Sequence, residues 1–206
     1  MLKIWGRLNS INVQKVVWCV DELGIPYERV EAGRQFGIVN TPEFLAMNPN
    51  GLVPLIDDGG FVLWESNAIV RYLAGRHGAG TLAPKDAQAH ANADRWMDWQ
   101  ATAFNPPIGQ TFTQLIRTPE AERSAAVIES ARQLAETRLA MLDAHLAKRT
   151  YVAGDAFSMA DIPLGLSVHR WLALPVKREP RPNVERWYAL LRARKGAAQA
   201  MAVPLT

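Results

Sequence analysis

The sequence predicts two domains of different structural class: an α/β domain over residues 1–80 and an all-helical domain over residues 86–206. In the first part, short strand-like runs alternate with helical segments, which is typical of a layered α/β fold. From residue 86 onward only helical periodicity is found. The stretch from Gly78 to Pro84 is rich in turn-forming residues and is expected to be a linker. With 206 residues, 49% of them hydrophobic, the chain is long enough for two small cores.

The first predicted elements are a strand and a helix. Residues 2–6 alternate between apolar and polar side chains, as a strand does. Residues 13–23 then place apolar side chains at helical spacing, with Ser10 or Asn12 as the N-cap. Gly24 follows at the position where a left-handed residue often ends a helix. The apolar residues of this helix are Val13, Val16, Val17, Val20 and Leu23.

A second strand and a second helix follow. Residues 27–30 read as the strand. Thr41 is a typical N-cap residue, and Pro42 after it suits the first turn of a helix. The chain therefore repeats the strand–helix pattern once.

A hairpin and a covering helix complete the first domain. Residues 53–57 and 61–63 flank Asp58-Gly59-Gly60, a strong hairpin signal. Ser66 is expected to cap the helix that follows. The predicted order is βαβαββα, an α/β fold with a helix packed on its sheet.

The second half is predicted to contain several helices. A long helical stretch through Trp96 and Trp99 ends or kinks near Pro106-Pro107. Thr118-Pro119-Glu120 is expected to start the next helix, which has an apolar stripe over residues 128–146. Residues 158–161 form a capping box with Asp161 in the place of the usual Glu or Gln. A last helix is expected to open at residue 182.

Composition excludes several kinds of chemistry. Cys19 is the only cysteine, so an internal disulfide, a Cys-x-x-Cys motif and a thiolate zinc site are impossible. The four histidines show no ligand spacing, and no metal is expected. The net charge of +3 comes from scattered residues, so no nucleic acid partner is expected. The sequence shows no targeting or membrane-spanning segment, which predicts a cytoplasmic protein without a membrane partner.

Four fragments, in order along both predicted domains, resemble the cytosolic glutathione S-transferase family. They are Ser10-Ile11-Asn12, Asn48-Pro-Asn-Gly-Leu-Val-Pro54, Glu65-Ser-Asn-Ala-Ile-Val-Arg-Tyr-Leu73 and Tyr151-Val-Ala-Gly-Asp-Ala-Phe-Ser-Met-Ala-Asp-Ile162. The resemblance is to bacterial members of the theta-like or nu-like Ser/Asn type. It implies a thioredoxin-like first domain that binds glutathione. It also implies a helical bundle domain that contributes an electrophile site and homodimer contacts, as in detoxification enzymes.

The resemblance implies two parts of the glutathione site. Ser66 and the start of its helix suit the γ-glutamyl carboxylate, since helix N-termini bind anions, and Glu65 suits the ammonium group. The Val53–Pro54 bond is expected to be cis, which leaves the Val53 backbone free to pair with the cysteinyl part of glutathione. On composition alone, the favoured interpretation is a simple cap with Glu65 as a solvated residue of the first turn, and the family motif around them reverses that preference.

The catalytic position is the junction of the first strand and first helix. A thiolate is the reactive form of a thiol, and a neutral donor near a helix N-terminus stabilises it. Ser10 is the predicted hydroxyl donor, with Asn12 as its partner or replacement. Neither a tyrosine nor a cysteine stands in this region, so a member of the tyrosine-type or cysteine-type classes is not expected, and Cys19 is expected to be a buried packing residue.

Two parts of the site depart from the family or are placed only roughly. Many relatives have a lysine before Val-Pro, but here the residue is Leu52. The glycyl carboxylate therefore needs other contacts, and the candidates are Arg34, Gln35, Asn40 and Asn50. The electrophile is expected between the domains, near Leu8, Trp96, Gln100, Phe104 and Trp171. Each of these tryptophans is also explained by ordinary core packing or a dimer contact.

The sequence supports a glutathione transferase that ionises the glutathione thiol and conjugates it to a small hydrophobic electrophile, with glutathione as the co-substrate. Two alternatives stay open. One is a glutathione-dependent disulfide or peroxide reductase, which the Ser-x-Asn pattern permits. The other is a binding protein of the same fold with little catalysis, since fold alone does not determine function.

Overall fold

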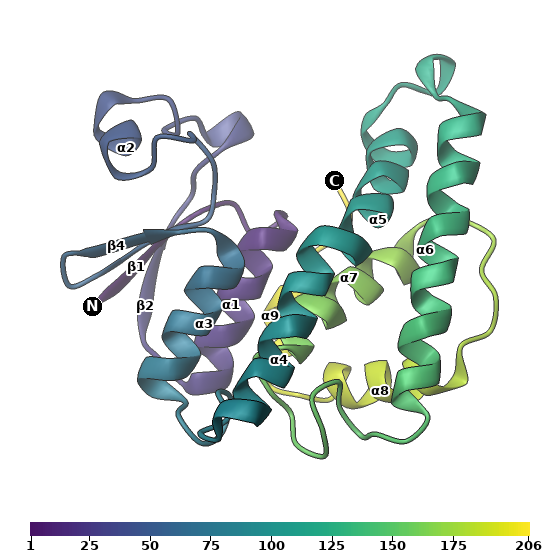
Figure 1. Ribbon diagram of the computed structural model, residues 1–206. Helices are drawn as coiled ribbons and strands as arrows, with labels where there is room; N and C mark the ends of the chain where they lie inside the picture. Colours follow the sequence, from purple (N-terminus) through teal and green to yellow (C-terminus); the bar gives the residue numbers. More distant parts are fainter. The chain divides into compact units, whose positions relative to one another are not determined.

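The computed structural model describes all residues from 1 to 206 and divides into two compact units (Figure 1). Unit 1 comprises Met1–Ala83 and Arg194–Val203, and unit 2 comprises Pro84–Ala193 and Pro204–Thr206. The sequence places residues 194–203 in the helical domain, whereas in the structure they pack with unit 1. No helix is long and apolar enough to cross a lipid bilayer.

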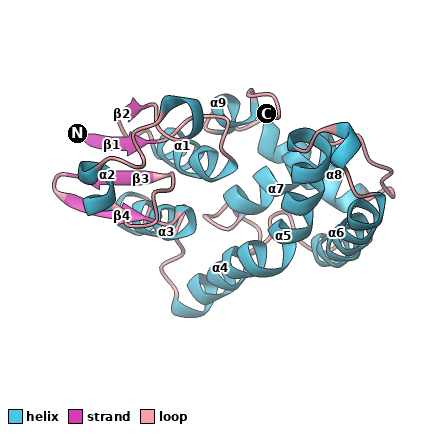
Figure 2. Ribbon diagram, turned by 90° about the horizontal axis from the view of Figure 1, so that it is seen from above, coloured by secondary structure: helices cyan, strands magenta, loops and turns pink.

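Unit 1 has the predicted order of elements around one mixed sheet. The elements are β1 (Leu2–Trp5), α1 (Ile11–Leu23), β2 (Tyr27–Val30), α2 (Pro42–Met47), β3 (Leu55–Asp58), β4 (Phe61–Trp64), α3 (Ser66–His77) and α9 (Ala197–Met201). The strand order is β2-β1-β3-β4 (Figure 2). Strand β2 runs parallel to β1, whereas β3 and β4 are antiparallel to their neighbours.

Local sequence signals explain several boundaries in unit 1. Gly24 ends α1 in the left-handed conformation, with φ of 65°. The Thr41 hydroxyl accepts a hydrogen bond from the Phe44 amide at 3.3 Å and so caps α2. Gly59 and Gly60, both with positive φ, form the turn between β3 and β4. These predictions are confirmed.

Helix α1 is buried on more than its apolar stripe, because it packs against both α3 and α9. The contact with α9 is supported by an ion pair between Arg194 and Glu22. The Tyr27 hydroxyl also donates to Gln199 Oε1 at 3.0 Å. Helix α9 has no signal in the sequence, because it is only five residues long and has no apolar periodicity of its own.

Gly196, directly before α9, is expected to tolerate no side chain. An added methyl group would lie 2.8 Å from the Glu22 backbone nitrogen, so Gly196→Ala is expected to destabilise the protein by about 1–3 kcal/mol. Gly109→Ala is the matched control, because a methyl group at this position in helix α5 (Asn105–Phe112) meets nothing within 4 Å. Urea unfolding of both variants tests this, and equal stability would contradict the close approach.

Unit 2 is entirely helical apart from its loops. Its helices are α4 (Ala87–Trp99), α5, α6 (Ala125–Leu146), α7 (Asp161–Ala173) and α8 (Pro182–Arg192). Helix α5 packs against α6 and α7, and α8 packs against α6 and α7. The sequence predicts an end or a kink of the helix near Pro106. At this point the structure has a π-helical segment, Gln100–Phe104, which joins α4 to α5. A widened turn is a known way for a helix to accommodate a missing proline N–H.

Three expected helix starts in the chain are displaced. Helix α7 begins at Asp161 with Ala160 in the N-cap position, two residues after Ser158, the N-cap of the predicted capping box. Helix α6 begins at Ala125 rather than near residue 118, because Ser124 is the cap and accepts a hydrogen bond from the Val127 amide at 3.3 Å. A short 3-10 turn, Glu120–Glu122, occupies the predicted start. Helix α3 begins at Ser66, with Glu65 rather than Ser66 in the N-cap position. Boundary shifts of one residue are common, but this one changes the role of Ser66.

Candidate functional site

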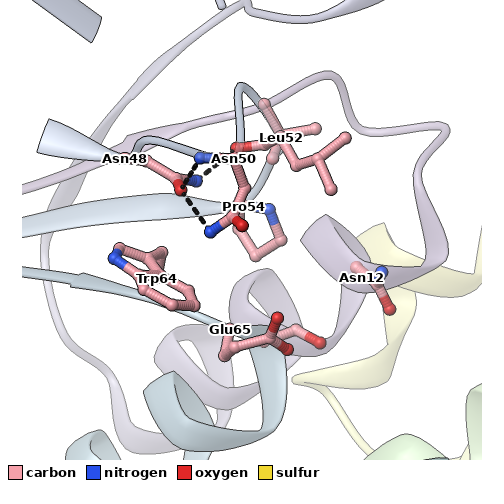
Figure 3. A pocket seen from close by; sticks show the side chains of 9 residues that line it. Asn12, Asn48, Asn50, Leu52, Pro54, Trp64 and Glu65 are labelled. Carbon is pink, nitrogen blue, oxygen red and sulfur yellow. Dashed lines mark hydrogen bonds between the residues drawn. The ribbon is translucent and has the colours of Figure 1, made fainter. Parts of the chain in front are cut away.

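One pocket lies entirely within unit 1, at the ends of three elements (Figure 3). The start of α1 contributes one side chain, the segment between α2 and β3 contributes five, and the junction of β4 and α3 contributes three. The lining residues are Asn12, Asn48, Asn50, Leu52, Val53, Pro54, Trp64, Glu65 and Ser66. Of the predicted site residues, the structure thus brings together Asn12, Asn50, Val53, Pro54, Glu65 and Ser66.

The segment before β3 is organised by Asn48. Its buried side chain donates to the Leu52 carbonyl at 2.8 Å and accepts from the Asn50 amide and side chain at 3.1 and 2.9 Å (Figure 3). The Val53–Pro54 peptide bond is cis, as expected. The Val53 amide and carbonyl make no hydrogen bond to another backbone group among the turns and loops. The loop therefore presents polar backbone groups at the pocket, and Asn48, which sequence reasoning treated only as part of a motif, holds its shape.

The junction of β4 and α3 places Glu65 and Ser66 together at the pocket. Glu65 has φ of 75° and ψ of 108°, a conformation that non-glycine residues seldom adopt and that occurs most often at functional sites. The Ile69 amide donates to the Glu65 carbonyl at 2.9 Å, which is the first hydrogen bond of the helix. The amides of the first turn, that of Ser66 included, have no partner within the helix and give this end a partial positive charge.

Lys15 lies beneath this helix start. Its side chain is only 3% exposed, and its Nζ donates to Ser66 Oγ at 3.3 Å and to Asn67 Oδ1 at 3.1 Å. Sequence analysis did not identify Lys15 as a site residue. Helical periodicity indicates which face of α1 is buried, but it does not indicate which side chains of α3 that face meets.

Ser10 and Asn12 both lie at the start of α1 but differ in their surroundings. Ser10 occupies the N-cap position, and its carbonyl accepts from the Gln14 amide at 2.9 Å. Its side chain forms no capping hydrogen bond, so the hydroxyl is available for another partner. Asn12 is exposed and lines the pocket, whereas Ser10 is 8% exposed and does not. The structure therefore places Asn12, and not Ser10, beside Glu65 and Ser66.

Arg34, Gln35 and Asn40 are exposed and lie outside the pocket, so Asn50 is the one glycyl-end candidate within it. Sequence analysis missed Arg7, which is 8% exposed. A methyl group on Gly33 would lie 3.6 Å from Arg7 Nη1 and 3.5 Å from a Val53 methyl group. Burial and the charge of Arg34 together lower the pKa of Arg7. Arg7 therefore lies close to Gly33 and Val53, and the positive charge of Arg34 acts on Arg7.

The five candidates for an electrophile site do not line this pocket. Leu8 is half-buried in unit 1. In unit 2, the Trp96 ring packs on the His145 ring with their centroids 4.3 Å apart. The Phe104 ring stacks on the Trp99 ring with their centroids 5.1 Å apart. The other two candidates are also buried in unit 2. Gln100 Nε2 donates to Ser167 Oγ at 2.9 Å, and Trp171 lines a small cavity with Glu136, Leu139 and Arg181.

Cys19 is fully buried on α1, with its sulfur 3.9 Å from the Val70 carbonyl oxygen. Burial, and to a smaller extent the charge of Glu22, raise the pKa of its thiol. A protonated, buried thiol is a poor nucleophile, which confirms the expected packing role. No three His, Cys, Asp or Glu side chains gather in a way that could hold a metal ion.

Comparisons with known proteins identify the family. Residues 1–75 match the family model of the glutathione S-transferase N-terminal domain, and residues 104–195 match that of the C-terminal domain. Glutathione S-transferase GstB of Escherichia coli strain K12 is 40% identical over 208 residues, covering 100% of both chains. Glutathione S-transferase 3 of Zea mays is 35% identical over 213 residues, covering 99% of this chain and 95% of its own length.

A solved structure agrees with these matches. The theta class glutathione S-transferase of Xanthomonas axonopodis pv. citri with glutathione bound superimposes with a TM-score of 0.95 at 44% sequence identity. The match covers 100% of this chain and 99% of that one. The resemblance noted in the sequence and the predicted combination of a thioredoxin-like domain with a helical domain are therefore confirmed. The chain belongs to the glutathione S-transferase family.

Proposed function

We propose that the protein is a glutathione transferase that binds glutathione in the pocket of unit 1 and activates its thiol for conjugation. The observation that carries the proposal is the convergence of Asn12, Val53, Glu65 and Ser66 on one pocket. The chemical groups of these residues are complementary to the parts of glutathione that a binding site must hold. They offer a donor for sulfur, a free backbone edge for the cysteinyl amide and a carboxylate beside a helix N-terminus for the α-amino acid group.

The γ-glutamyl end is proposed to bind at the start of α3. The α-carboxylate accepts from the Ser66 hydroxyl and the free amides of the first turn, and the ammonium group pairs with Glu65. The unusual backbone of Glu65 supports this role, because it brings the carboxylate to the same pocket as Ser66. The cysteinyl part pairs with the Val53 backbone as a short added strand.

The glycyl carboxylate is proposed to lie on the Val53 side, held by Asn50 and by the positive potential of Arg34 and Arg7. The mutual proximity of these arginines supports this placement, because an anion between or beside two cations relieves their repulsion. Gln35 and Asn40 are the remaining candidates on the same loop. These contacts take the role of the lysine that many relatives have at the position of Leu52.

In the proposed reaction, Ser10 and Asn12 stabilise the glutathione thiolate, and the thiol proton passes to solvent. The thiolate sulfur then forms a bond to the electrophilic carbon, and the leaving group departs with the bonding electron pair. The electrophile is proposed to be a small hydrophobic molecule that the helical domain binds through residues among Leu8, Trp96, Gln100, Phe104 and Trp171. No step requires a metal.

Binding of glutathione by calorimetry tests the pocket. Glu65→Gln and Ser66→Ala are each expected to weaken binding about tenfold or more, the loss typical of a charge-assisted hydrogen bond. Glu43→Gln is the matched control, because Glu43 is an exposed residue in the first turn of α2. Failure of the unmodified protein to bind glutathione would exclude the proposal.

The reaction type is tested with three substrates on one sample: an aryl halide, a small disulfide and a hydroperoxide. Turnover of the aryl halide supports conjugation. Turnover of only the disulfide or the peroxide supports the reductase, and binding without turnover supports a binding protein of the same fold.

A homodimer and a cytoplasmic location are the two remaining parts of the proposal. The dimer would form through the first two long helices of the helical domain. In support, Leu134 and Met141 on α6 lie two turns apart on one face and are 44% and 42% exposed. Analytical ultracentrifugation measures the mass directly, and Leu134→Glu with Met141→Glu is expected to yield the monomer. Cell fractionation tests the location.

A further inference from the structure

In the contact of Lys15 with the start of α3, the donor and the acceptor of each hydrogen bond are defined by chemistry. An ammonium group carries three hydrogen-bond donors and no acceptor. At the 3.3 Å contact with Lys15 Nζ, the Ser66 oxygen must therefore be the acceptor. The single hydrogen of the Ser66 hydroxyl is then left to point toward another partner. At the 3.1 Å contact, Asn67 Oδ1 is the acceptor in the same way.

The place of Ser66 decides where that hydrogen can be used. Ser66 is 6% exposed, and its remaining open side is the pocket that it lines with Glu65 and Asn12. A hydroxyl that accepts from behind and donates in front favours an acceptor in the pocket, such as a carboxylate. The charge of Lys15 has the same sign as the N-terminal end of α3, so both favour an anion at this point. Screening by water is weak here, because Lys15 is only 3% exposed.

We propose that Lys15 is a positioning residue for the γ-glutamyl α-carboxylate. Lys15 lies behind Ser66, makes it a hydrogen-bond donor toward the pocket and adds positive charge beneath the carboxylate. This inference rests on the proposed function, in which glutathione is the ligand. It differs from a purely structural role of Lys15 in joining α1 to α3, because it depends on the negative charge of the ligand.

The test compares glutathione with an analogue in which the α-carboxylate is replaced by hydrogen, 4-aminobutanoyl-cysteinyl-glycine. Lys15→Met is expected to weaken glutathione binding about tenfold and to leave the already weak binding of the analogue unchanged. Lys15→Gln keeps a donor without the charge and is expected to fall between Lys15→Met and the unmodified protein. Lys15→Arg, which keeps both, is expected to retain most of the affinity. Dissociation constants from calorimetry are the readout.

Each result separates the two proposals. If the unmodified protein does not bind glutathione, the proposed function fails. If it binds glutathione but Lys15→Met and Lys15→Gln weaken both ligands by the same factor, Lys15 is structural and only this inference is overturned. A second check uses Ser66→Ala, which removes the hydroxyl through which Lys15 acts. In that background the effect of Lys15→Met on glutathione binding is expected to shrink, and a fully additive loss would contradict the inference. If Lys15→Met does not fold, as judged by circular dichroism, the same comparisons apply to Lys15→Gln.

Discussion

Replacing Ser10 with alanine is expected to reduce kcat/KM for conjugation by about 10² to 10³, the usual cost of losing one donor to a developing anion. The pKa of the enzyme-bound glutathione thiol is expected to rise toward the value of a free thiol in water, about 8.5, because the donor that stabilises the thiolate is lost. Asn12→Ala is also expected to lower kcat/KM, by a smaller factor, because Asn12 lines the pocket and assists Ser10 in stabilising the thiolate.

The surroundings of Ser10 make this substitution a clean experiment. A serine at an N-cap usually contributes about 1 kcal/mol to stability through its side chain. Here the Ser10 side chain forms no capping bond, so Ser10→Ala is expected to unfold at nearly the same urea concentration as the unmodified protein. The thiol pKa is measured from the ultraviolet absorbance of the bound thiolate, and the rate from the pH dependence of kcat/KM. Unchanged profiles in both Ser10→Ala and Asn12→Ala would exclude the assignment.

Asp161→Ala is expected to have the largest effect on stability, a loss of about 3–5 kcal/mol. The Asp161 carboxylate is fully buried and accepts from the Val152 amide at 3.0 Å, from the Ser158 amide and hydroxyl at 2.9 and 3.1 Å, and from Trp187 Nε1 at 2.9 Å. Burial raises the pKa of Asp161 to about 6, and the hydrogen bonds from Val152, Trp187 and Ser158 act in the opposite direction. Alanine would leave the donors in a dry interior without an acceptor, which is more costly than the loss of the bonds themselves.

Two variants serve as controls for this loss. Asp155→Ala removes an exposed carboxylate from the same loop and is expected to change the free energy of unfolding by less than about 0.5 kcal/mol. Asp161→Asn keeps one acceptor and is expected to recover part of the stability. Unfolding in urea, followed by tryptophan fluorescence and by circular dichroism, gives the values. A small loss for Asp161→Ala would mean that water replaces the carboxylate.

Much of this fold could be predicted from local signals. Gly24 ends a helix because it adopts the left-handed conformation without cost, and Gly59-Gly60 closes a hairpin for a similar reason. The Ser158–Asp161 spacing predicted the hydrogen bond from the Ser158 amide to the Asp161 carboxylate, which the structure contains, although α7 itself begins at Asp161. In each case the signal and the structure that it specifies lie within a few residues of each other.

The errors have a common physical origin. Helix α6 begins at Ala125 rather than near residue 118, because Ser124 is the N-cap and accepts a hydrogen bond from the Val127 amide. Residues 194–203 were assigned to the helical domain because they follow it in sequence, but Glu22, Gly196 and Arg194 tie them to α1. Neither the start of α6 nor the packing of residues 194–203 could be predicted from the neighbouring sequence. In each case several local arrangements are similar in stability, and packing against distant residues decides between them.

Local patterns in the sequence were enough to predict the order of the elements from β1 to α3 and the family. They also supplied the candidate site residues: Ser10-x-Asn12, Val53-Pro54 and Glu65-Ser66. Packing of the helices on the sheet and on each other places Asn12 rather than Ser10 in the pocket lining and brings Lys15 against Ser66. Lys15 and Ser66 are 51 positions apart in the chain. A contact of that range is set by how two helices pack on each other, and no periodicity within either helix specifies which residues will meet.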